Sequence, residues 1–554
     1  MGKITVTVDD IKLEVRKDVS IYEAITEADF PYYDMSIPTL YYLKGVQEVD
    51  TSGVAIVEVD GEIVNATTTR IKEGMNIQTD SPAVVAQRKA AVEEILKRHN
   101  KNCMECFRCD SCELQNLAHK MGLKDAETMP VEKLEPWDMT SVVLIRDNNK
   151  CIKCKRCINV CAKVQAVSAI VATGEGLDTV IQPSSPAGLA AASCVNCGQC
   201  VAVCPVGALT EKTAIDAVKE AIADPAKKVF VQVAPAVRAA LGEAFEFNPG
   251  VDVEGRIAGA LRDLGFDKVF DTKVAADLTI IEEANELIER VQNDGVLPMF
   301  TSCCPAWVKY AEHFYPELLP NLSTCKAPHT MFGAVLKSYY AEKEGLNKED
   351  IVVVSVMPCT AKKFEITRDD MDGAGVKDVD FVLTTNELAK MIKDAELRFE
   401  FYSNKTKFDD PFNCGTGAGV IFGRTGGVME AALRTAADKI PGVEIKTAVV
   451  SGLANANQLL QQIKNGECDV QFVEVMACPG GCVNGGGQPH QDAKTRLLND
   501  IPKIRKAALD ANDEKSEIRK SHEDPAMIKL YEEYMGEPGG EKAHQLLHTT
   551  YKIR

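Results

Sequence analysis

The sequence predicts an α+β multidomain protein in which metal-binding segments follow a β-rich N-terminal domain and precede a larger α/β domain. Three observations carry this prediction. Residues 1–79 contain paired apolar alternations, residues 99–204 hold closely spaced cysteines, and apolar strands alternate with helical stretches from about residue 225 onward.

The first domain, residues 1–79, is predicted to contain two hairpins. They turn at the Asp-Asp pair 9–10 and at the Asp-Gly pair 60–61, and a short helical pattern begins at Ser20. Both hairpins have alternating apolar residues, which is typical of strands with one buried face.

Four further segments follow. Residues 80–139 begin with an amphipathic helix (80–98) and continue into a His/Cys cluster, and residues 140–212 carry two matching cysteine runs. Residues 213–500 alternate strands such as VFVQVA, IVVVSVM and KTAVVSGL with helices, as in an α/β core. Residues 501–554 are polar and helical, which suits an outer wrap.

Composition narrows the class of protein. The chain has 554 residues, a net charge of −18 and 20 cysteines. The acidic balance argues against a nucleic-acid partner, and no apolar run is long enough to span a membrane. The first residues lack the apolar core of a signal peptide, so we expect a cytoplasmic protein whose C-x-x-C runs bind metal.

The two matching runs both read C-x-x-C-x-x-C-x-x-x-C, which is the spacing of a two-cluster ferredoxin. Three thiolates of one run wrap a cubane, while the fourth reaches the other cluster. Structural zinc is disfavoured, since zinc loops usually split their ligands in pairs. One 4Fe–4S cluster is therefore assigned to Cys151, Cys154, Cys157 and Cys204, and the other to Cys194, Cys197, Cys200 and Cys161.

The His/Cys cluster offers His99, Cys103, Cys106 and Cys112 as ligands. Spacing alone leaves zinc of the Cys3His type open, and Cys109 is also in register. The two ferredoxin runs downstream favour a 4Fe–4S cluster.

Three loops in the second half carry the strongest signal: TSCCPAW (301–307), MPCTAKKFE (357–365) and EVMACPGGCVNGGGQP (474–489). Cysteines on three separated loops can clamp one buried cubane. Cys303 and Cys304 are adjacent, so one is expected to ligate while the other faces a different cavity. Lys362 is a fixed cation that could hold an anionic ligand.

These loops resemble those of the iron-only (FeFe) hydrogenase large subunit, and the resemblance covers almost the whole chain. It implies a β-grasp, plant-ferredoxin-like first domain, a His–Cys cluster segment, a two-cluster ferredoxin domain and an α/β domain for the H-cluster. This cofactor joins a 4Fe–4S cluster to a two-iron unit with CO, cyanide and an azadithiolate bridge. The ligands implied for its cubane are Cys304, Cys359, Cys478 and Cys482, with Cys482 bridging to the two irons.

The resemblance also assigns roles around the two irons. Lys362 is expected to hydrogen-bond a cyanide and Cys303 to be the first proton carrier. Residues expected to pack around the cofactor are Met357, Met476, Ala234 and Pro235.

A proton path is expected from Glu283, Glu286 and Arg290, which fall on one helix face. From the residues alone, a solvated helix with a Glu286–Arg290 ion pair is the favoured interpretation. The resemblance implies instead that these residues, with Ser323, carry protons from Cys303 to the surface.

Some positions depart from the family pattern. Ala236 stands where a serine hydroxyl is frequent, Ala306 replaces a glycine, and His329 replaces a glutamine. Ala236 removes one possible hydrogen bond to the cofactor, and Ala306 stiffens its loop. A lone histidine such as His329 is expected to serve packing.

The largest departure is in the first domain. The positions expected to hold the four cysteines of a 2Fe–2S cluster carry Tyr41, Ser52, Ala55 and Thr67, and no cysteine precedes Cys103. We therefore expect three accessory 4Fe–4S clusters, no 2Fe–2S cluster, and a first domain that serves for packing or docking. The cysteines left without a role, and expected to be structural, are Cys109, Cys325, Cys414 and Cys468.

The expected activity is the reversible reduction of protons to H2, with electrons from ferredoxin or from a partner subunit. One alternative makes the chain a subunit of a larger complex with a nicotinamide- or formate-oxidising partner. Another is a hydrogen sensor or an iron–sulfur assembly factor. The complete set of Cys303, Lys362 and Cys482 argues against the second alternative.

Overall fold

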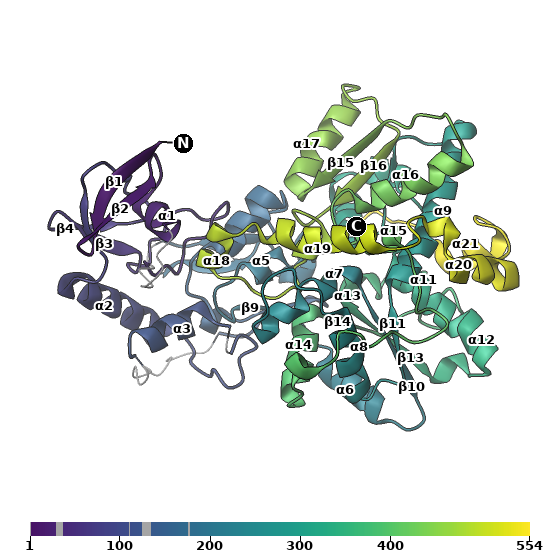
Figure 1. Ribbon diagram of the computed structural model, residues 1–554, viewed down its shortest axis with the longest axis horizontal. Helices are drawn as coiled ribbons and strands as arrows, with labels where there is room; N and C mark the ends of the chain where they lie inside the picture. Colours follow the sequence, from purple (N-terminus) through teal and green to yellow (C-terminus); the bar gives the residue numbers. More distant parts are fainter. Residues whose placement is uncertain (1, 29–36, 110, 124–134, 176–177) are drawn as a thin grey trace. The chain divides into compact units, whose positions relative to one another are not determined.

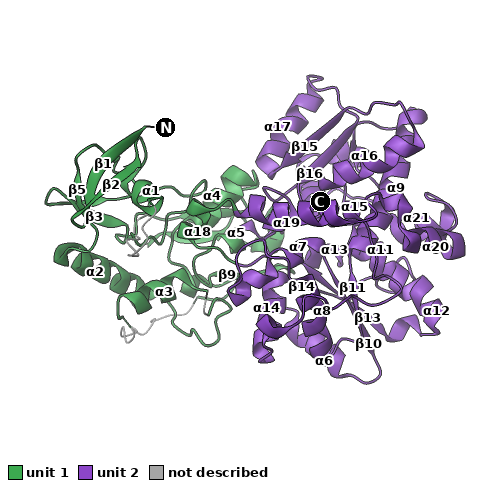
Figure 2. Ribbon diagram, in the orientation of Figure 1, with its two compact units in different colours: residues 1–194, 200–210, 490–500 green, residues 195–199, 211–489, 501–554 purple. Residues whose placement is uncertain are grey.

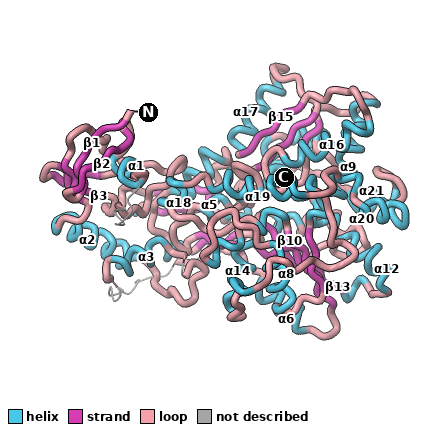
Figure 3. The backbone as a smooth tube through the Cα atoms, viewed as in Figure 1, coloured by secondary structure: helices cyan, strands magenta, loops and turns pink. Residues whose placement is uncertain are grey.

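The computed structural model describes residues 2–28, 37–109, 111–123, 135–175 and 178–554, and the chain folds as two compact units (Figures 1 and 2). Unit 1 comprises residues 1–194, 200–210 and 490–500, and unit 2 comprises residues 195–199, 211–489 and 501–554. The second cysteine run is therefore shared between the units. In Figure 3 the strands fall into separate groups joined by helices and loops.

The N-terminal part of unit 1 is a five-stranded sheet in the order β2-β1-β5-β3-β4. Both predicted hairpins are confirmed, since β1 pairs with β2 and β3 with β4, each antiparallel. The predicted helix is α1, and Ser20 caps it together with Glu23 in a reciprocal capping box. The bounds are β1 Lys3–Val8, β2 Ile11–Arg16, α1 Ile21–Thr26, β3 Ile56–Val59, β4 Glu62–Asn65 and β5 Asn76–Gln78.

The rest of unit 1 carries the cysteine segments on short elements. These are α2 Pro82–Arg98, α3 Glu113–Lys120, β6 Leu144–Arg146, α4 Arg156–Asn159, β7 Ile170–Thr173, β8 Val180–Pro183, β9 Leu209–Glu211 and α18 Ala493–Leu498. A fully buried Arg156 on α4 connects this helix to α3 and to the first domain. Its guanidinium donates to both carboxylate oxygens of Glu113, at 2.6 and 2.9 Å, and to the carbonyl of Tyr42 at 2.8 Å.

Unit 2 contains a four-stranded parallel sheet in the order β11-β10-β13-β14. Its central strands β10 (Lys228–Val233) and β13 (Ile351–Met357) are mostly apolar, and nearly all their residues are buried. Such strands need helices on both faces. The edge strands are β11 Lys268–Asp271 and β14 Phe381–Thr384.

A second parallel sheet of unit 2 has the order β12-β16-β15, with bounds Met299–Phe300, Phe472–Met476 and Thr447–Ser451. In Figure 1 the two sheets lie in the lower and upper parts of this unit, with α15 (Gly417–Ile421) and α19 (Ile501–Lys515) between them. Ligands of open parallel sheets bind beyond the carboxyl ends of the strands, which is where the cysteine loops of this unit begin.

The other helices of unit 2 surround these sheets. They are α6 Ile215–Ala223, α7 Pro235–Arg238, α8 Glu254–Asp263, α9 Lys273–Gln292, α10 Pro305–Phe314, α11 Pro328–Val335, α12 Ala341–Glu344, α13 Lys362–Glu365, α14 Thr385–Asp394, α16 Gly427–Lys439 and α17 Leu453–Lys464. A short helix, α5 Gln199–Ala202, lies within the second cysteine run.

The C-terminal tail is helical as predicted, with α19 followed by α20 (Pro525–Leu530) and a further helix, α21 (Glu541–Leu547). It is more than an outer wrap, because Leu509 and Leu547 are fully buried. Arg505 is also buried and donates to both carboxylate oxygens of Glu243, at 2.7 and 2.5 Å. No helix in the described ranges is long and apolar enough to cross a membrane.

Candidate active site

The three cysteine loops of unit 2 each follow a parallel strand. Cys303 and Cys304 lie between β12 and α10, Cys359 follows β13, and Cys478 and Cys482 follow β16. The strands therefore deliver all five thiols to the same region of the unit.

Four of these thiols are neighbours. Cys304 lies close enough to Cys359, Cys478 and Cys482 to interact with each electrostatically. Burial raises the pKa of all four thiols, that of Cys359 to about 12. Thiolates can persist in such a place only beside a compensating cation, and cluster iron is one.

Hydrogen-bond donors face two of these sulfurs. Gln199 Nε2 lies 3.2 Å from Cys478 Sγ, and the backbone amide of Ala477 lies 3.5 Å from Cys304 Sγ. Donors of this kind stabilise the sulfur ligands of an iron–sulfur cluster and tune its potential. The donor set therefore fits a 4Fe–4S cluster.

Glycine is required at two positions of the last loop. Gly481 has a φ of +97°, which side chains rarely adopt, and it lets the chain turn between Cys478 and Cys482. At Gly486 a Cβ atom would stand 2.4 Å from the carbonyl oxygen of Cys197. A side chain there would push the cysteine loops apart.

An apolar cavity adjoins three of the four thiols, Cys304, Cys359 and Cys482. It brings together Cys303 and Lys362 with the other residues expected to face the two irons, Ala234, Pro235, Met357 and Met476. Ala236, His329 and Phe422 also line it. A mostly apolar pocket with a thiol and an ammonium group fits a cofactor with small anionic ligands.

Lys362 is held by two acceptors. Its Nζ donates to the carbonyl of Cys303 at 2.9 Å and to Glu365 Oε2 at 2.8 Å. Burial disfavours its charge, but Glu365 outweighs this effect and raises the pKa of Lys362. The lysine is therefore a fixed cation at the cavity wall.

Glu365 is a residue that the sequence interpretation missed. Burial opposes its ionisation, but Lys362 and His329 lower its pKa to about 2. Its position three residues after Lys362, within the MPCTAKKFE loop, is the sequence feature that could have identified it.

His329 has more than the packing role expected for it. Its Nε2 lies 2.5 Å from Glu365 Oε2 and its Nδ1 lies 3.2 Å from Ser355 Oγ. Burial and the neighbouring Lys362 lower the pKa of His329, which keeps the ring neutral. It therefore orients Glu365, which in turn fixes Lys362.

The expected proton carriers lie near one another on one side of the cavity. Glu283 and Glu286 are on α9, and Glu283 is fully buried beside Ser323 and the backbone of Ser302. Glu286 Oε2 accepts from Ser323 Oγ at 2.8 Å, and Arg290 Nη2 donates to Glu286 Oε1 at 2.6 Å. The i, i+4 ion pair is thus present, but the helix face is not a solvated one.

The pKa values of Glu283 and Cys303 are both raised. Burial and the nearby Glu286 raise the pKa of Glu283 to about 8. Burial, Glu283 and Cys304 raise the pKa of Cys303 well above that of a free thiol. Both groups therefore hold protons at neutral pH.

The first ferredoxin set is gathered in unit 1. Cys157 lies near Cys154, Cys151 and Cys204, as expected for one cubane. Cys161 has Cys194 as a neighbour, in line with the exchange of fourth ligands between the runs.

The His/Cys segment also fits a metal centre. Cys103 and Cys112 both have Cys106 as a neighbour. His99 is hydrogen-bonded to the backbone of Lys150, while its Nδ1 is buried without a hydrogen-bond partner among the described residues. Metal-ligating histidines use this arrangement, with one nitrogen on a carbonyl and the other free. Cys109 neighbours Cys103 as well, so the choice between Cys109 and Cys112 stays open.

Two of the cysteines expected to be structural are not fully buried. Cys414 is partly exposed and its Sγ donates to Asp524 Oδ1 at 3.4 Å, and Cys468 is also partly exposed. Cys325 is buried as expected.

The first domain does not fit a 2Fe–2S cluster. The backbone amides of Leu40 and Tyr41 donate to Asp50 Oδ2 at 2.7 and 2.9 Å, and the amide of Ser52 donates to Asp50 Oδ1 at 2.8 Å. Asp50 is fully buried, and Thr67 Oγ1 accepts from its amide at 3.0 Å. A carboxylate thus receives the amide groups of the loop, and three of the four positions expected for cysteine belong to its network.

Comparisons with known proteins agree with the arrangement of the cysteine loops, but the match of residues 2–82 to a 2Fe–2S cluster binding domain is in tension with the expectation that the chain holds no such cluster. Residues 227–486 match the family profile of the iron only hydrogenase large subunit, C-terminal domain, and residues 499–554 match the iron hydrogenase small subunit. Residues 88–127 match an iron–sulfur binding region of NADH-ubiquinone oxidoreductase, residues 150–210 a 4Fe–4S dicluster domain, and residues 2–82 a 2Fe–2S iron–sulfur cluster binding domain.

Two curated relatives are similar over their whole length. The NADP-reducing hydrogenase subunit of Solidesulfovibrio fructosivorans is 41% identical, covering 100% of this chain and 99% of the relative. Iron hydrogenase 1 of Clostridium pasteurianum is 40% identical, covering 99% and 100%. A solved structure of an apo FeFe-hydrogenase variant from Chlamydomonas reinhardtii is 38% identical with a TM-score of 0.55, covering 62% of this chain and 99% of that one.

Proposed function

This chain belongs to the iron-only (FeFe) hydrogenase family, and on that premise we propose how its residues share the work of interconverting H2 with two protons and two electrons. One observation carries the proposal. A single cavity places a thiol, Cys303, and a fixed cation, Lys362, beside three of the four clustered thiols.

Four thiols would hold the cubane of the H-cluster: Cys304, Cys359, Cys478 and Cys482, with Cys482 also reaching the two-iron unit. When bound, this cofactor supplies an open iron position and a nearby amine base. Lys362 Nζ would orient a cyanide ligand by a charge-assisted hydrogen bond. Met357, Met476, Ala234 and Pro235 would keep water away from the irons.

Protons would move along side chains of this unit. Cys303 Sγ–H would exchange a proton with the cavity, and Glu283, protonated near neutral pH, would pass it to the Ser323 hydroxyl. Ser323 donates to Glu286, which pairs with Arg290 at the outer end of the path. The shifted pKa of Glu283 suits a carrier that must both take and release a proton.

Electrons would travel through three accessory 4Fe–4S clusters, ligated by the two ferredoxin runs and by His99, Cys103, Cys106 and Cys112. The first domain would have the β-grasp fold without a cluster, because Asp50 already binds the loop amides. It would serve as a docking or packing surface. We place the enzyme in the cytoplasm, where thiols stay reduced.

The electron donor would be ferredoxin or a partner subunit. Full-length similarity to an NADP-reducing hydrogenase subunit favours the second candidate, a place within a larger nicotinamide-coupled complex. Co-purification from the native host distinguishes the two. A chain that purifies alone and is reduced efficiently by free ferredoxin counts against an obligate complex.

The central test is hydrogen evolution by the chain after the two-iron unit has been supplied, with reduced ferredoxin or a viologen dye as donor. A fully loaded but inactive protein would overturn the assignment of the residues. Iron analysis should give four irons for each cubane, and EPR of the reduced chain should lack a rhombic 2Fe–2S signal.

A further inference from the structure

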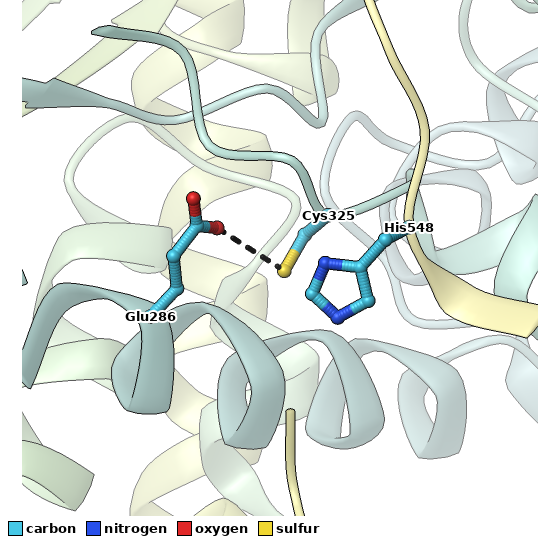
Figure 4. A group of neighbouring side chains, drawn as sticks. All are labelled: Glu286, Cys325 and His548. Atoms are coloured by element: carbon cyan, nitrogen blue, oxygen red, sulfur yellow. Dashed lines mark hydrogen bonds between the residues drawn. The ribbon is translucent and has the colours of Figure 1, made fainter. Parts of the chain in front are cut away.

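Three side chains outside the cofactor cavity converge at the outer end of the proton path. Glu286 comes from α9, Cys325 from the segment before α11, and His548 from the residue after α21. Their ligand atoms all lie within 4.8 Å of one another, and Cys325 Sγ is 3.9 Å from Glu286 Oε2. Figure 4 shows the carboxylate, the sulfur and one ring nitrogen pointing toward a common space.

We propose that Glu286, Cys325 and His548 form an inhibitory binding site for one divalent transition-metal ion of the zinc type. A thiolate, an imidazole and a carboxylate are the ligands that Zn²⁺ accepts, and three protein ligands leave a fourth position for water. On binding, Zn²⁺ replaces the thiol proton of Cys325, which leaves to solvent.

The backbone holds two of the ligands in place. Cys325 and His548 face each other in an antiparallel bridge, flanked by hydrogen bonds from Lys326 N to Leu547 O and from Thr549 N to Thr324 O, both 2.8 Å. The Cys325 and His548 side chains are therefore positioned by the fold and not by a mobile loop tip. Modest rotation of the long Glu286 side chain would close the remaining distance to a metal.

The surroundings of His548 match those of a metal ligand. Its Nε2 lies 3.1 Å from Glu282 Oε2, and Glu282 is itself fixed by the amide of Gly539 at 2.8 Å and by the hydroxyl of Tyr531. A ring nitrogen that donates to a carboxylate leaves the other nitrogen, here Nδ1, as the ligand. Nδ1 now interacts with the Thr324 hydroxyl at 2.7 Å, which can turn away.

The local charge favours a cation. Burial and the nearby carboxylates of Glu286 and Glu282 raise the pKa of the Cys325 thiol well above its usual value. Arg290 is the cation that pairs with Glu286 in the described structure. A divalent ion would therefore enter a region of excess negative charge, where it stabilises both the thiolate and the carboxylates.

The inhibitory effect rests on the proposed proton path. Glu286 Oε2 is the oxygen that accepts from Ser323, and a metal bound there would take that acceptor away. Proton exchange between Ser323 and the surface would stop while the cofactor itself stayed intact. Metal binding and the loss of H2 evolution can therefore be measured separately.

A second cluster of the chain provides a matched control. Asp438, His522 and Glu523 also lie within 4.8 Å of one another, but both carboxylates are exposed and no sulfur takes part. It should bind Zn²⁺ weakly and without effect on activity. His522→Ala is therefore the control variant for His548→Gln.

The first test uses Co²⁺ as a spectroscopic probe on the enzyme with its iron–sulfur clusters in place. A difference spectrum should show cobalt–thiolate charge-transfer absorption at one metal per chain, absent from Cys325→Ser and weaker in His548→Gln. His522→Ala should bind as the wild type does. An identical spectrum in wild type and Cys325→Ser would overturn the site.

The second test follows H2 evolution while Zn²⁺ is added to the fully loaded enzyme. Inhibition should be reversed by a chelator, and Cys325→Ser should raise the half-inhibiting concentration by at least about 100-fold. Glu282→Gln, which keeps the size of the side chain but removes the carboxylate partner of His548, should raise it about 10–100-fold. Cobalt binding at Cys325 without inhibition by zinc would refute the inhibitory role and count against Glu286 as a proton carrier. Loss of hydrogen evolution without metal in the wild type would instead point to failure of the assigned function.

Discussion

Glu286 Oε2 lies 2.8 Å from the hydroxyl of Ser323, and this hydrogen bond joins helix α9 to the segment that precedes α11. The same carboxylate accepts from the amide of Thr324 at 3.0 Å and from Arg290 at 2.6 Å. Three hydrogen-bond donors therefore face the Glu286 side chain. Glu283, on the previous turn of the helix, is instead buried with a pKa raised to about 8. Ser323 thus lies between a carboxyl group that holds a proton and a carboxylate that can receive one.

Removing the serine hydroxyl should interrupt this transfer. We expect Ser323→Ala to lower H2 evolution by about 10²-fold or more, because positioned proton carriers contribute factors of this size. The measurement is steady-state H2 evolution with a viologen donor, together with infrared spectra of the loaded cofactor. Ser338→Ala is the control, since Ser338 is outside the proposed path and donates to the carbonyl of Ala334 at 2.6 Å. Equal activity of the two variants would remove Ser323 from the path.

The raised pKa of Glu283 also makes stability depend on pH. Unfolded, this carboxyl group loses its proton near pH 4.5, whereas in the folded protein it keeps the proton up to about pH 8. Between these values the folded state binds the extra proton, so stability falls as pH rises. Glu283→Gln cannot titrate and should gain about 3–5 kcal/mol over the wild type across this window.

Thermal midpoints at a fixed scan rate, taken near about pH 5.5 and about pH 8.5, check this expectation. The gap between the variant and the wild type should widen at the higher pH. A constant gap would mean that Glu283 is ionised in the folded protein at neutral pH.

Lys362 and Glu365 should behave as a coupled buried pair. Lys362→Met leaves Glu365 without its cation and should destabilise the protein by about 3 kcal/mol. The double variant Lys362→Met/Glu365→Gln should recover part of this loss, because the uncompensated charge is gone. Thermal midpoints of protein that carries 4Fe–4S clusters but no two-iron unit separate this effect from catalysis. Additive effects of the two substitutions would contradict the pairing.

Asp50→Asn should destabilise the first domain while leaving the active site intact. The amide side chain cannot accept from all the backbone amides that Asp50 binds, and buried donors left unsatisfied cost about 1–3 kcal/mol each. Hydrogen exchange of residues 37–70 should become faster, while viologen-driven H2 evolution stays unchanged. Asp60→Asn, at the exposed turn of the second hairpin, serves as the control. Unchanged exchange in Asp50→Asn would show that the loop does not depend on this carboxylate.

Cysteine spacing and strand periodicity predicted much of this molecule. The two hairpins of the first domain and the parallel strands β10 and β13 follow from local apolar patterns, and these patterns act over a few residues. The three thiol loops could be located for the same reason, since each carries its signature within a short segment.

Local sequence patterns could not predict contacts between segments that are far apart in the sequence. Nothing near His548 in the sequence indicates that it faces Cys325, and His329 on α11 meets Glu365 on α13 across 36 residues of sequence. Asp50 was missed because its role follows from the amides of another loop and not from any motif of its own. Side-chain partners set by tertiary packing are the part that a single sequence leaves undetermined.

The Asp50 network has a consequence for biosynthesis. Ferredoxin-type loops need iron and sulfide delivered by the cell. In this loop the backbone amides are instead bound by Asp50, which is part of the chain itself. Domains that precede others in a chain are translated first and fold as units. On the proposal that the first domain holds no cluster, it would mature when iron is scarce, and iron limitation would delay only the assembly of the segments after residue 98.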